Sequence, residues 1–365
     1  MRIMMAALAA LASLLLCAAP APAATPQTVL RLFVAEPDNA GMVVVSSAFK
    51  QRVEEASNGA IEVRVYHDSI LGDDATAQFH RAQRGRETMV IGGITSVEPL
   101  CRRLGVVTLP YLFANLEQVV RGTTGEAGAL LDAYAREAGL RVVAWNYSDW
   151  RHLTNGRRPI TAMADMRGLR FRVPFSAVLI ATIRAFGGIP CSFPSGMTRK
   201  AIEQGLVDGQ CNGYGMAKGL ALLEAGQSQL TEAHFTYRLD PLVISEAVFQ
   251  KLSPEAQEMV LEAGEHASRA SLAFQEQVSV VSKHDLRERG LAISQLTDED
   301  AWKEKALAEV WPDVAQIVGG AEAINAYLDA CGLPRWTPAG EETAAVPSAD
   351  GEGGGASRGG AGAPR

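Results

Sequence analysis

Two arginines lie at the ends of apolar strand patterns, and their type and position suit the binding of a carboxylate. The segment 169–173 reads as a short strand that stops at Pro174, and Arg172 lies at its carboxyl end. Open α/β sheets bind ligands at the carboxyl ends of their strands, and a guanidinium can grip a carboxylate with two parallel hydrogen bonds. An exposed or internally paired arginine is the competing interpretation, and the local pattern taken alone favours it.

Arg151 follows a second predicted strand, whose end is rich in aromatic residues. Trp145 and Trp150 both precede it. Such a strand end beside a cation can form one wall of a pocket, although ordinary core with an exposed charge gives the same pattern. The segment 205–213 is glycine-rich, but the order of its glycines does not match a phosphate-binding loop, and it can be a simple turn.

The residue patterns that mark catalysis are absent from the sequence. It contains no GxSxG nucleophile elbow, no P-loop and no GxGxxG fingerprint. Its histidines have neither HxH nor HExxH spacing, so a catalytic metal is not expected. We therefore expect no cofactor, no metal and no enzymatic activity.

The cysteines indicate neither a zinc site nor a redox motif, because no CxxC pair occurs. Export permits disulfides, so a bond between Cys191 and Cys211 is conceivable, although a chain of this size does not need one.

The N-terminus has the three parts of a secretory signal peptide. Arg2 gives a positive start, an apolar run covers 3–19, and the small residues of 20–24 follow. We expect cleavage near residue 23 or 24 and a mature protein in the periplasm; Leu16 before Cys17 argues against a lipoprotein. The formal net charge of −7 argues against nucleic acid and against an anionic membrane surface as partners.

Strand and helix patterns alternate along the chain, which predicts an α/β fold with parallel or mixed sheets covered by helices. A helix is expected over 40–56, capped by Asp38 or Asn39. A long helix should begin at Ser253 and Pro254, run to about Arg289 and stop at Gly290; it either bends near Gly264 or bridges two domains. Strands are expected at 28–34, 61–66, 89–94, 106–109, 142–145, 171–173 and 242–244.

The size of the chain predicts two domains. The roughly 310 residues that we expect to be ordered exceed the size at which single cores stop growing, about 250–300 residues. Segment 341–365 is rich in Gly, Ala, Ser and Pro, and we expect a disordered tail because it cannot bury enough apolar surface.

Five segments in this order resemble the extracytoplasmic solute-binding subunits of tripartite ATP-independent periplasmic (TRAP) transporters, the DctP-like family. The likeness runs from about Leu30 to Leu333. The segments are ILGDD at 70–74, TLPYLF at 108–113, RHLTNGRRPI at 151–160, MRGLRFRVP at 166–174 and VDGQCN at 207–212.

The resemblance implies a two-lobed periplasmic-binding-protein (Venus-flytrap) fold with hinge strands and a long bridging helix. It implies a protein that captures a small organic acid and delivers it to the membrane subunits of a TRAP transporter. We expect a monomer. The expected division is a signal peptide at 1–24, lobe I at 25–148 plus 238–277, lobe II at 149–237 plus 278–336, and a tail at 337–365.

The resemblance also implies which residues bind the ligand. Arg172 is expected to pair with its carboxylate, and Arg151 and Asn212 to add donors to the same group. Gln210 belongs to the same motif as Asn212. Glu36 ends the first strand and is expected to contact a ligand hydroxyl or amine. Three aromatic residues are candidate apolar walls, with plain core as the alternative: Trp145, Trp150 and Tyr237.

The chain departs from the family pattern in two places. Cys211 and Gly213 replace a glutamate and a proline, and the stretch 194–199 lacks an aromatic pair and a carboxylate. Three alternatives remain open: a binding protein of another transporter class, an extracytoplasmic ligand sensor, and an enzyme acting on a small acid. The last would need a nucleophile, base or metal beside Arg172.

Overall fold

The computed structural model describes residues 27–36, 39–67 and 75–338. The predicted signal peptide, the predicted tail from 341 onward and the ILGDD segment at 70–74 lie outside these residues. Within the described part, no helix is both long enough and apolar enough to cross a membrane.

One half of the molecule is built on a five-stranded sheet with the order β2-β1-β3-β10-β4. The strands β1, β2 and β3 are parallel, and β10 runs antiparallel to both β3 and β4. The strands are β1 (Thr28–Val34), β2 (Ile61–Tyr66), β3 (Met89–Ile91), β4 (Leu140–Trp150) and β10 (Tyr237–Ser245).

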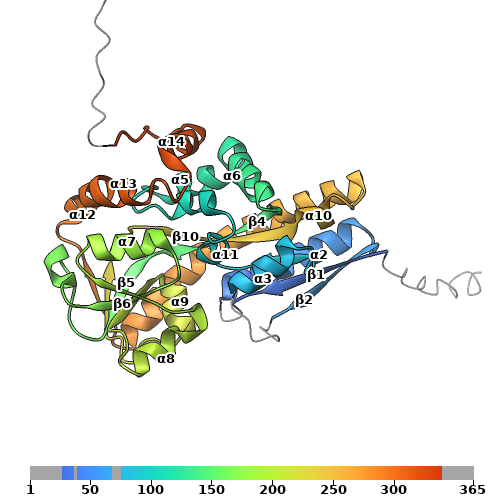
Figure 1. The fold of residues 1–365 in the computed structure, drawn as a ribbon. Coiled ribbons are helices and arrows are strands. Elements are labelled where there is room, and N and C mark those ends of the chain that lie inside the picture. Colours follow the sequence, from blue (N-terminus) through green and yellow to red (C-terminus); the bar gives the residue numbers. More distant parts are fainter. Residues whose placement is uncertain (1–26, 37–38, 68–74, 339–365) are drawn as a thin grey trace, which may run out of the picture.

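Helices cover both faces of this sheet (Figure 1). On one face, Leu30 and Leu32 pack with side chains of α2 (Ala40–Ala56) and α11 (Pro254–Glu288). On the other face, residues of α3 (Ala75–Gln83), α6 (Gly125–Glu137) and α14 (Gly320–Ala330) form a second apolar cluster.

The other half is built on a six-stranded sheet with the order β11-β9-β5-β8-β6-β7. Here β6 runs parallel to β7 and β8, whereas β5 runs antiparallel to β8 and β9. The strands are β5 (His152–Asn155), β6 (Arg170–Val173), β7 (Ile189–Ser192), β8 (Gly209–Asn212), β9 (Gln229–Glu232) and β11 (Ala292–Gln295).

The chain crosses between the two sheets through short links that join a strand of one sheet to a strand of the other. These linked strands correspond to the hinge strands of a two-lobed fold. Arg151 alone separates β4 from β5, and residues 233–236 separate β9 from β10. The two links are joined by a hydrogen bond from the Arg151 N–H to the Thr236 carbonyl at 2.7 Å.

The long helix α11 bridges the two halves. It contacts α2 and β4 in one half and α9 in the other. Its first turn is capped as predicted, because the Ser253 hydroxyl accepts the Ala256 N–H. A Cβ at Gly264 would lie 1.8 Å from the Val143 carbonyl oxygen, so this glycine lets α11 lie directly on β4. A bend near Gly264 stays a prediction.

The remaining helical segments connect the strands and pack in both halves. They are α4 (Ile94–Val97), α5 (Leu116–Thr123), α7 (Ala177–Ala185), α8 (Thr198–Glu203), α9 (Tyr214–Gly219), α10 (Glu246–Phe249), α12 (Glu299–Lys305), α13 (Trp311–Val314), the 3₁₀ turns η1 (Arg102–Thr108), η2 (Met163–Met166) and η3 (Ser195–Met197), and the π-helical turn η4 (Ala306–Val310).

Two predicted strands differ from the structure. The predicted strand at 106–109 is wrong: Val106 and Val107 are buried but belong to η1. A short apolar run has no periodicity that separates a strand from a buried turn. The strand at 89–94 ends at Ile91, because two glycines follow it and α4 then begins.

The conceivable disulfide is not present, since Cys191 and Cys211 are both free thiols. They lie on β7 and β8, which flank β6 on opposite sides, and they pack into different apolar clusters. The lobe boundaries stay a prediction; we note that α14 contacts α6 and η1 in the half with the five-stranded sheet.

Candidate functional site

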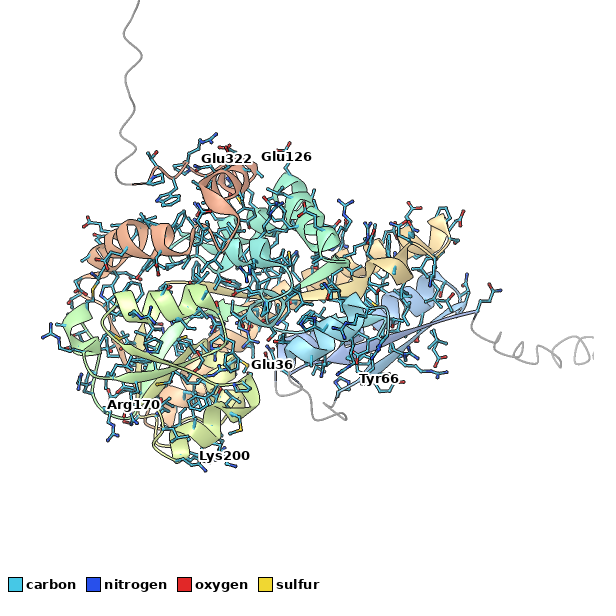
Figure 2. All side chains as sticks on the ribbon, viewed as in Figure 1. Glu36, Tyr66, Glu126, Arg170, Lys200 and Glu322 are labelled. Atoms are coloured by element: carbon cyan, nitrogen blue, oxygen red, sulfur yellow. The ribbon has the colours of Figure 1, made fainter. Side chains whose placement is uncertain are left out.

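A cavity of about 490 Å³ lies between the two halves. Strand ends, helix starts and links form its lining. Residues at or just after the ends of β1, β6 and β8 contribute, together with the starts of α3 and α4 and the link between β4 and β5. The segment 193–197, residues of α9 and its end, and one residue of β10 complete the lining. Glu36, which follows β1, lies where the two halves meet (Figure 2). The volume is within the usual range for small-molecule sites.

Arg172 is a buried cation in this lining. It is 4% exposed, and its Nε and Nη2 both donate to the Phe193 carbonyl at 3.0 and 2.7 Å. Among the described residues, no carboxylate forms an ion pair with it. Burial lowers the pKa of Arg172 to about 10, although the nearby charge of Glu36 opposes the shift.

Arg151 and Asn212 form a second polar group in the lining. Arg151 Nη1 donates to the Cys211 carbonyl at 2.8 Å and to Asn212 Oδ1 at 3.0 Å. Its Nε is buried without a hydrogen-bond partner, and burial lowers its pKa. Asn212 Nδ2 donates to Gln210 Oε1 at 2.8 Å. Gln210 lies behind the lining and orients Asn212 from there.

We call Arg151 and Arg172 the anchor arginines. Each lies where the sequence placed it, at a strand end facing the cavity. Both guanidinium groups are buried, and neither forms an ion pair with a carboxylate among the described residues. One buried N–H, that of Arg151 Nε, also has no hydrogen-bond partner. Such groups can bind an anionic ligand with bidentate, charge-assisted hydrogen bonds.

Arg238 is a third arginine of the cavity, and it was missed at the sequence level. It lies on β10, donates from Nε to Asp240 Oδ1 at 2.8 Å and from Nη2 to Glu36 Oε2 at 2.9 Å, and reaches Asn212 Oδ1 at 3.4 Å. The two carboxylates raise its pKa despite burial. A signal existed: Arg238 and Asp240 are two residues apart in an apolar strand, so both face the same side.

Glu36 joins the two halves across the cavity. Besides pairing with Arg238, its Oε2 accepts the Ser195 hydroxyl at 3.1 Å, and Ser195 belongs to η3 of the other half. Burial alone would raise the pKa of Glu36, but Arg238 and Arg172 lower it below its ordinary value. Glu36 is therefore a carboxylate in the lining with protein partners, and its contact with a ligand hydroxyl or amine stays a prediction.

The three aromatic candidates do not form the cavity wall. Trp145 is 5% exposed and lies in the apolar cluster beneath the sheet. Trp150 packs edge-on against Tyr237 with ring centroids 5.2 Å apart. All three are core residues, the alternative interpretation of their pattern. The apolar lining comes instead from residues after β6 and around η3.

This apolar lining forms a distinct surface, which we call the apolar wall. It comprises Pro174 and Pro194 with five larger side chains: Phe175, Phe193, Met197, Met216 and Leu220.

One histidine cluster lies outside the cavity lining. His152, Glu232 and His234 bring their ligand-type atoms within 4.8 Å of one another, although no spacing in the sequence indicated it. The Lys283 ammonium donates to Glu232 at 2.6 Å and Tyr214 donates at 2.8 Å. Because a lysine already supplies the positive charge, we infer no metal there.

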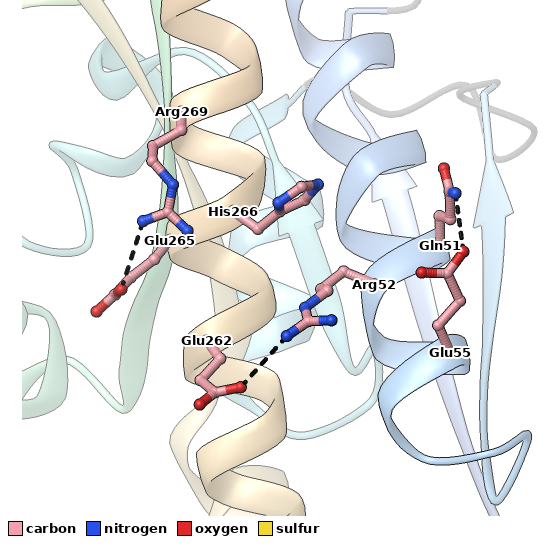
Figure 3. Close-up of a pocket in the computed structure, with 7 residues that line it drawn as sticks. All are labelled: Gln51, Arg52, Glu55, Glu262, Glu265, His266 and Arg269. Atoms are coloured by element: carbon pink, nitrogen blue, oxygen red, sulfur yellow. Dashed lines mark hydrogen bonds and ion pairs between the residues drawn. The ribbon is translucent and has the colours of Figure 1, made fainter.

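A second hollow, of about 400 Å³, lies between α2 and α11 on the outside of the molecule (Figure 3). All of its side chains are exposed and most pair with one another. Arg52 lies 3.8 Å from Glu262, and Arg269 lies 3.7 Å from Glu265. Exposed pairs of this kind contribute little and are typical of a solvated surface.

Known proteins with similar sequences are solute-binding proteins, which agrees with a polar cavity between two halves. The sequence matches the DctP family, described as bacterial extracellular solute-binding protein family 7, over residues 35–316. It is 25% identical over 287 residues to the 2,3-diketo-L-gulonate-binding periplasmic protein YiaO of Escherichia coli, covering 78% of this chain and 86% of YiaO. It is 24% identical over 290 residues to the C4-dicarboxylate-binding protein DctP of Vibrio cholerae, covering 79% and 86% of the two chains.

Solved structures show the same fold. A TRAP periplasmic solute-binding protein of Xanthobacter autotrophicus with bound β-D-galacturonate superposes with a TM-score of 0.77 at 19% identity, over 84% of this chain and all of that one. A relative from Shewanella oneidensis with bound succinate gives a TM-score of 0.75 at 22% identity, over 84% and 100%. The chain belongs to the DctP family of TRAP solute-binding proteins.

Proposed function

We propose that this protein captures a small carboxylate-containing solute between its two lobes through the anchor arginines and Asn212, and presents it to the membrane subunits of a TRAP transporter. The observation that carries the proposal is the pair of buried guanidinium groups that line the cavity without a carboxylate partner. A buried cation without a counter-charge costs several kcal/mol, and a ligand carboxylate offsets that cost.

Capture follows from the position of the donors. Arg172 presents a planar fork at the end of β6, and Arg151 and Asn212 add donors from the adjacent strand ends. Closure of the lobes removes water from the cavity, and the lower local dielectric strengthens the pair between guanidinium and carboxylate. Binding and closure therefore favour each other.

The mature protein is expected in the periplasm as a monomer, after removal of residues 1–24. The family consists of extracellular solute-binding proteins, and the described lining combines arginines, hydroxyls, one amide and apolar side chains with Glu36, whose carboxylate pairs with Arg238. We propose binding without catalysis. Ligand recovered after incubation should be chemically unchanged, and turnover would contradict this.

Thermal unfolding with a panel of organic acids and their carboxamides tests the proposal. An acid that binds should stabilise the protein by about 2.7 kcal/mol when present at 100 times its Kd. The matching carboxamide keeps the shape but lacks the charge, so it should give no comparable stabilisation. Equal stabilisation by an acid and its amide, or no stabilisation by any acid, would refute carboxylate capture.

Small-angle scattering tests lobe closure. Saturating ligand should reduce the radius of gyration of the free protein, because the cavity lies between the two halves and closure brings them together. An unchanged radius with an open starting state would contradict closure.

A further inference from the structure

The cavity has two chemically different walls. The apolar wall comes from the half that holds the six-stranded sheet. The opposite wall is polar and carries the hydroxyls of Thr76, Thr95 and Ser96. The anchor arginines belong to the same lining. A ligand that fills this space meets positive charge, an apolar surface and hydroxyl groups.

The apolar wall holds large side chains that the protein leaves uncovered. Phe175 is 55% exposed and Met197 is 38% exposed. Phe175 lies three residues after Arg172, so it is placed beside the anchor by the same strand end. Exposed apolar side chains gathered in a concave, otherwise polar site mark a surface that an apolar partner covers.

The charges of the cavity limit the number of carboxylates that a ligand can carry. The charge of Arg238 is matched by Glu36 and Asp240. Of the three arginines in the described lining, Arg151 and Arg172 form no ion pair with a carboxylate, although the charge of Glu36 acts on Arg172. Glu36 is the one acidic side chain in the described lining, and Arg238 and Arg172 hold it ionised.

A second ligand carboxylate placed away from the anchor would face Glu36 without a free guanidinium. Like charges facing each other in a partly desolvated site repel strongly. A polyhydroxylated acid has a different difficulty, because its hydroxyls would lie against the apolar wall without partners, and each unsatisfied polar group costs about 1–3 kcal/mol.

From these walls and charges we infer that the ligand is a monocarboxylate with an aromatic or branched-alkyl body, rather than a sugar acid or a dicarboxylate. This inference rests on the proposed capture of a carboxylate and narrows it. The carboxylate lies on the anchor arginines, the body packs on Phe175 and Met197, and any hydroxyl or keto group near the carboxylate faces Thr95 and Ser96.

Calorimetric titration with acids of similar size tests the ligand class. The probes are 3-phenyllactate, glucuronate and succinate, with 3-phenyllactamide as the uncharged control. We expect 3-phenyllactate to bind at least about tenfold more tightly than either other acid, a difference of about 1.4 kcal/mol. The amide should show no measurable binding.

Substitutions on the wall test its role directly. Phe175→Ser and Met197→Ser should each weaken 3-phenyllactate binding about tenfold, or about 1.4 kcal/mol, and leave the weaker binding of glucuronate nearly unchanged. Both side chains are partly exposed, so the variants should fold. Val280→Ser is the matched control, because Val280 is 68% exposed on α11 and does not line the cavity; it should bind like the wild type.

The outcomes separate the two proposals. If glucuronate or succinate binds as tightly as 3-phenyllactate and depends on Arg172, the ligand class is wrong and carboxylate capture stands. If 3-phenyllactate binds but Phe175→Ser and Met197→Ser have no effect, the assignment of the wall is overturned. If no acid binds, both proposals fail.

Discussion

Removing the Arg172 guanidinium should weaken ligand binding strongly without destabilising the free protein to the same degree. In the bound state Arg172 is expected to contact the ligand carboxylate in a closed, desolvated site. Truncating one member of a buried charge pair costs about 2–5 kcal/mol. At about 1.4 kcal/mol per tenfold change, Arg172→Ala should raise Kd by about 30-fold to several thousand-fold.

The free protein should respond differently, because there Arg172 is a buried cation without a carboxylate. Its pKa is lowered from 12.5 to about 10, and at 1.36 kcal/mol per unit this corresponds to roughly 3 kcal/mol of penalty on the charged form. Arg172→Met removes the charge and keeps an apolar chain of similar length. Such replacements are often neutral or stabilising, so its melting temperature without ligand should equal or exceed that of the wild type.

Calorimetric titration of folded variants is the assay, and two further variants sharpen it. Arg172→Lys keeps the charge but loses the planar fork, so it should show a smaller loss than Arg172→Ala. Arg167→Ala is the control, because Arg167 is exposed. Arg170 is not suitable, since it makes two hydrogen bonds to Asp208 at 3.0 Å. Binding by Arg172→Ala within about threefold of wild type, about 0.7 kcal/mol, would refute the anchor.

Three further predictions concern stability. Burial raises the pKa of Glu98 from 4.5 to about 7, so between these pH values the folded state holds a proton that the unfolded state releases. The free energy of unfolding should therefore fall as pH rises from about 4.5 through 7. Denaturant unfolding at several pH values measures this dependence, and Glu98→Gln should flatten it. Gly264→Ala should destabilise strongly, since its Cβ would lie 1.8 Å from the Val143 oxygen; a melting temperature near wild type would contradict the close approach of α11. Deleting 341–365 should leave ligand affinity and melting temperature nearly unchanged, and a loss of several degrees would show that the tail packs.

Local sequence signals predicted the elements whose ends carry their own caps. The helix α2 begins after Asn39, whose side chain accepts the Gly41 and Met42 N–H groups, and α11 begins at the predicted Ser253 cap. Each cap forms between residues two or three positions apart, so the local sequence is enough to predict it. The segment that became η1 has no such signal, and its burial is decided by distant side chains.

The site was predictable where a strand end and a motif coincided. Arg172, Arg151 and Asn212 all line the cavity as expected. Arg238 was missed because its partner Glu36 lies about 200 positions away in the sequence. The two residues meet because β1 and β10 both pair with β3. The apolar wall was missed for a related reason: Met197 lies in the stretch 194–199, where the chain departs from the family pattern and the resemblance carries no expectation.

Under the proposed capture, one predicted binding residue lies inside the link between the two sheets, and this position offers a way for a ligand to drive closure. Arg151 is the whole link between β4 and β5, and its backbone N–H is bonded to the other link at Thr236. A carboxylate that contacts the Arg151 side chain would therefore act directly on a residue that links the two sheets. A ligand shifts a conformational equilibrium only through contacts that differ between the two states, and a binding residue inside the hinge provides such a contact.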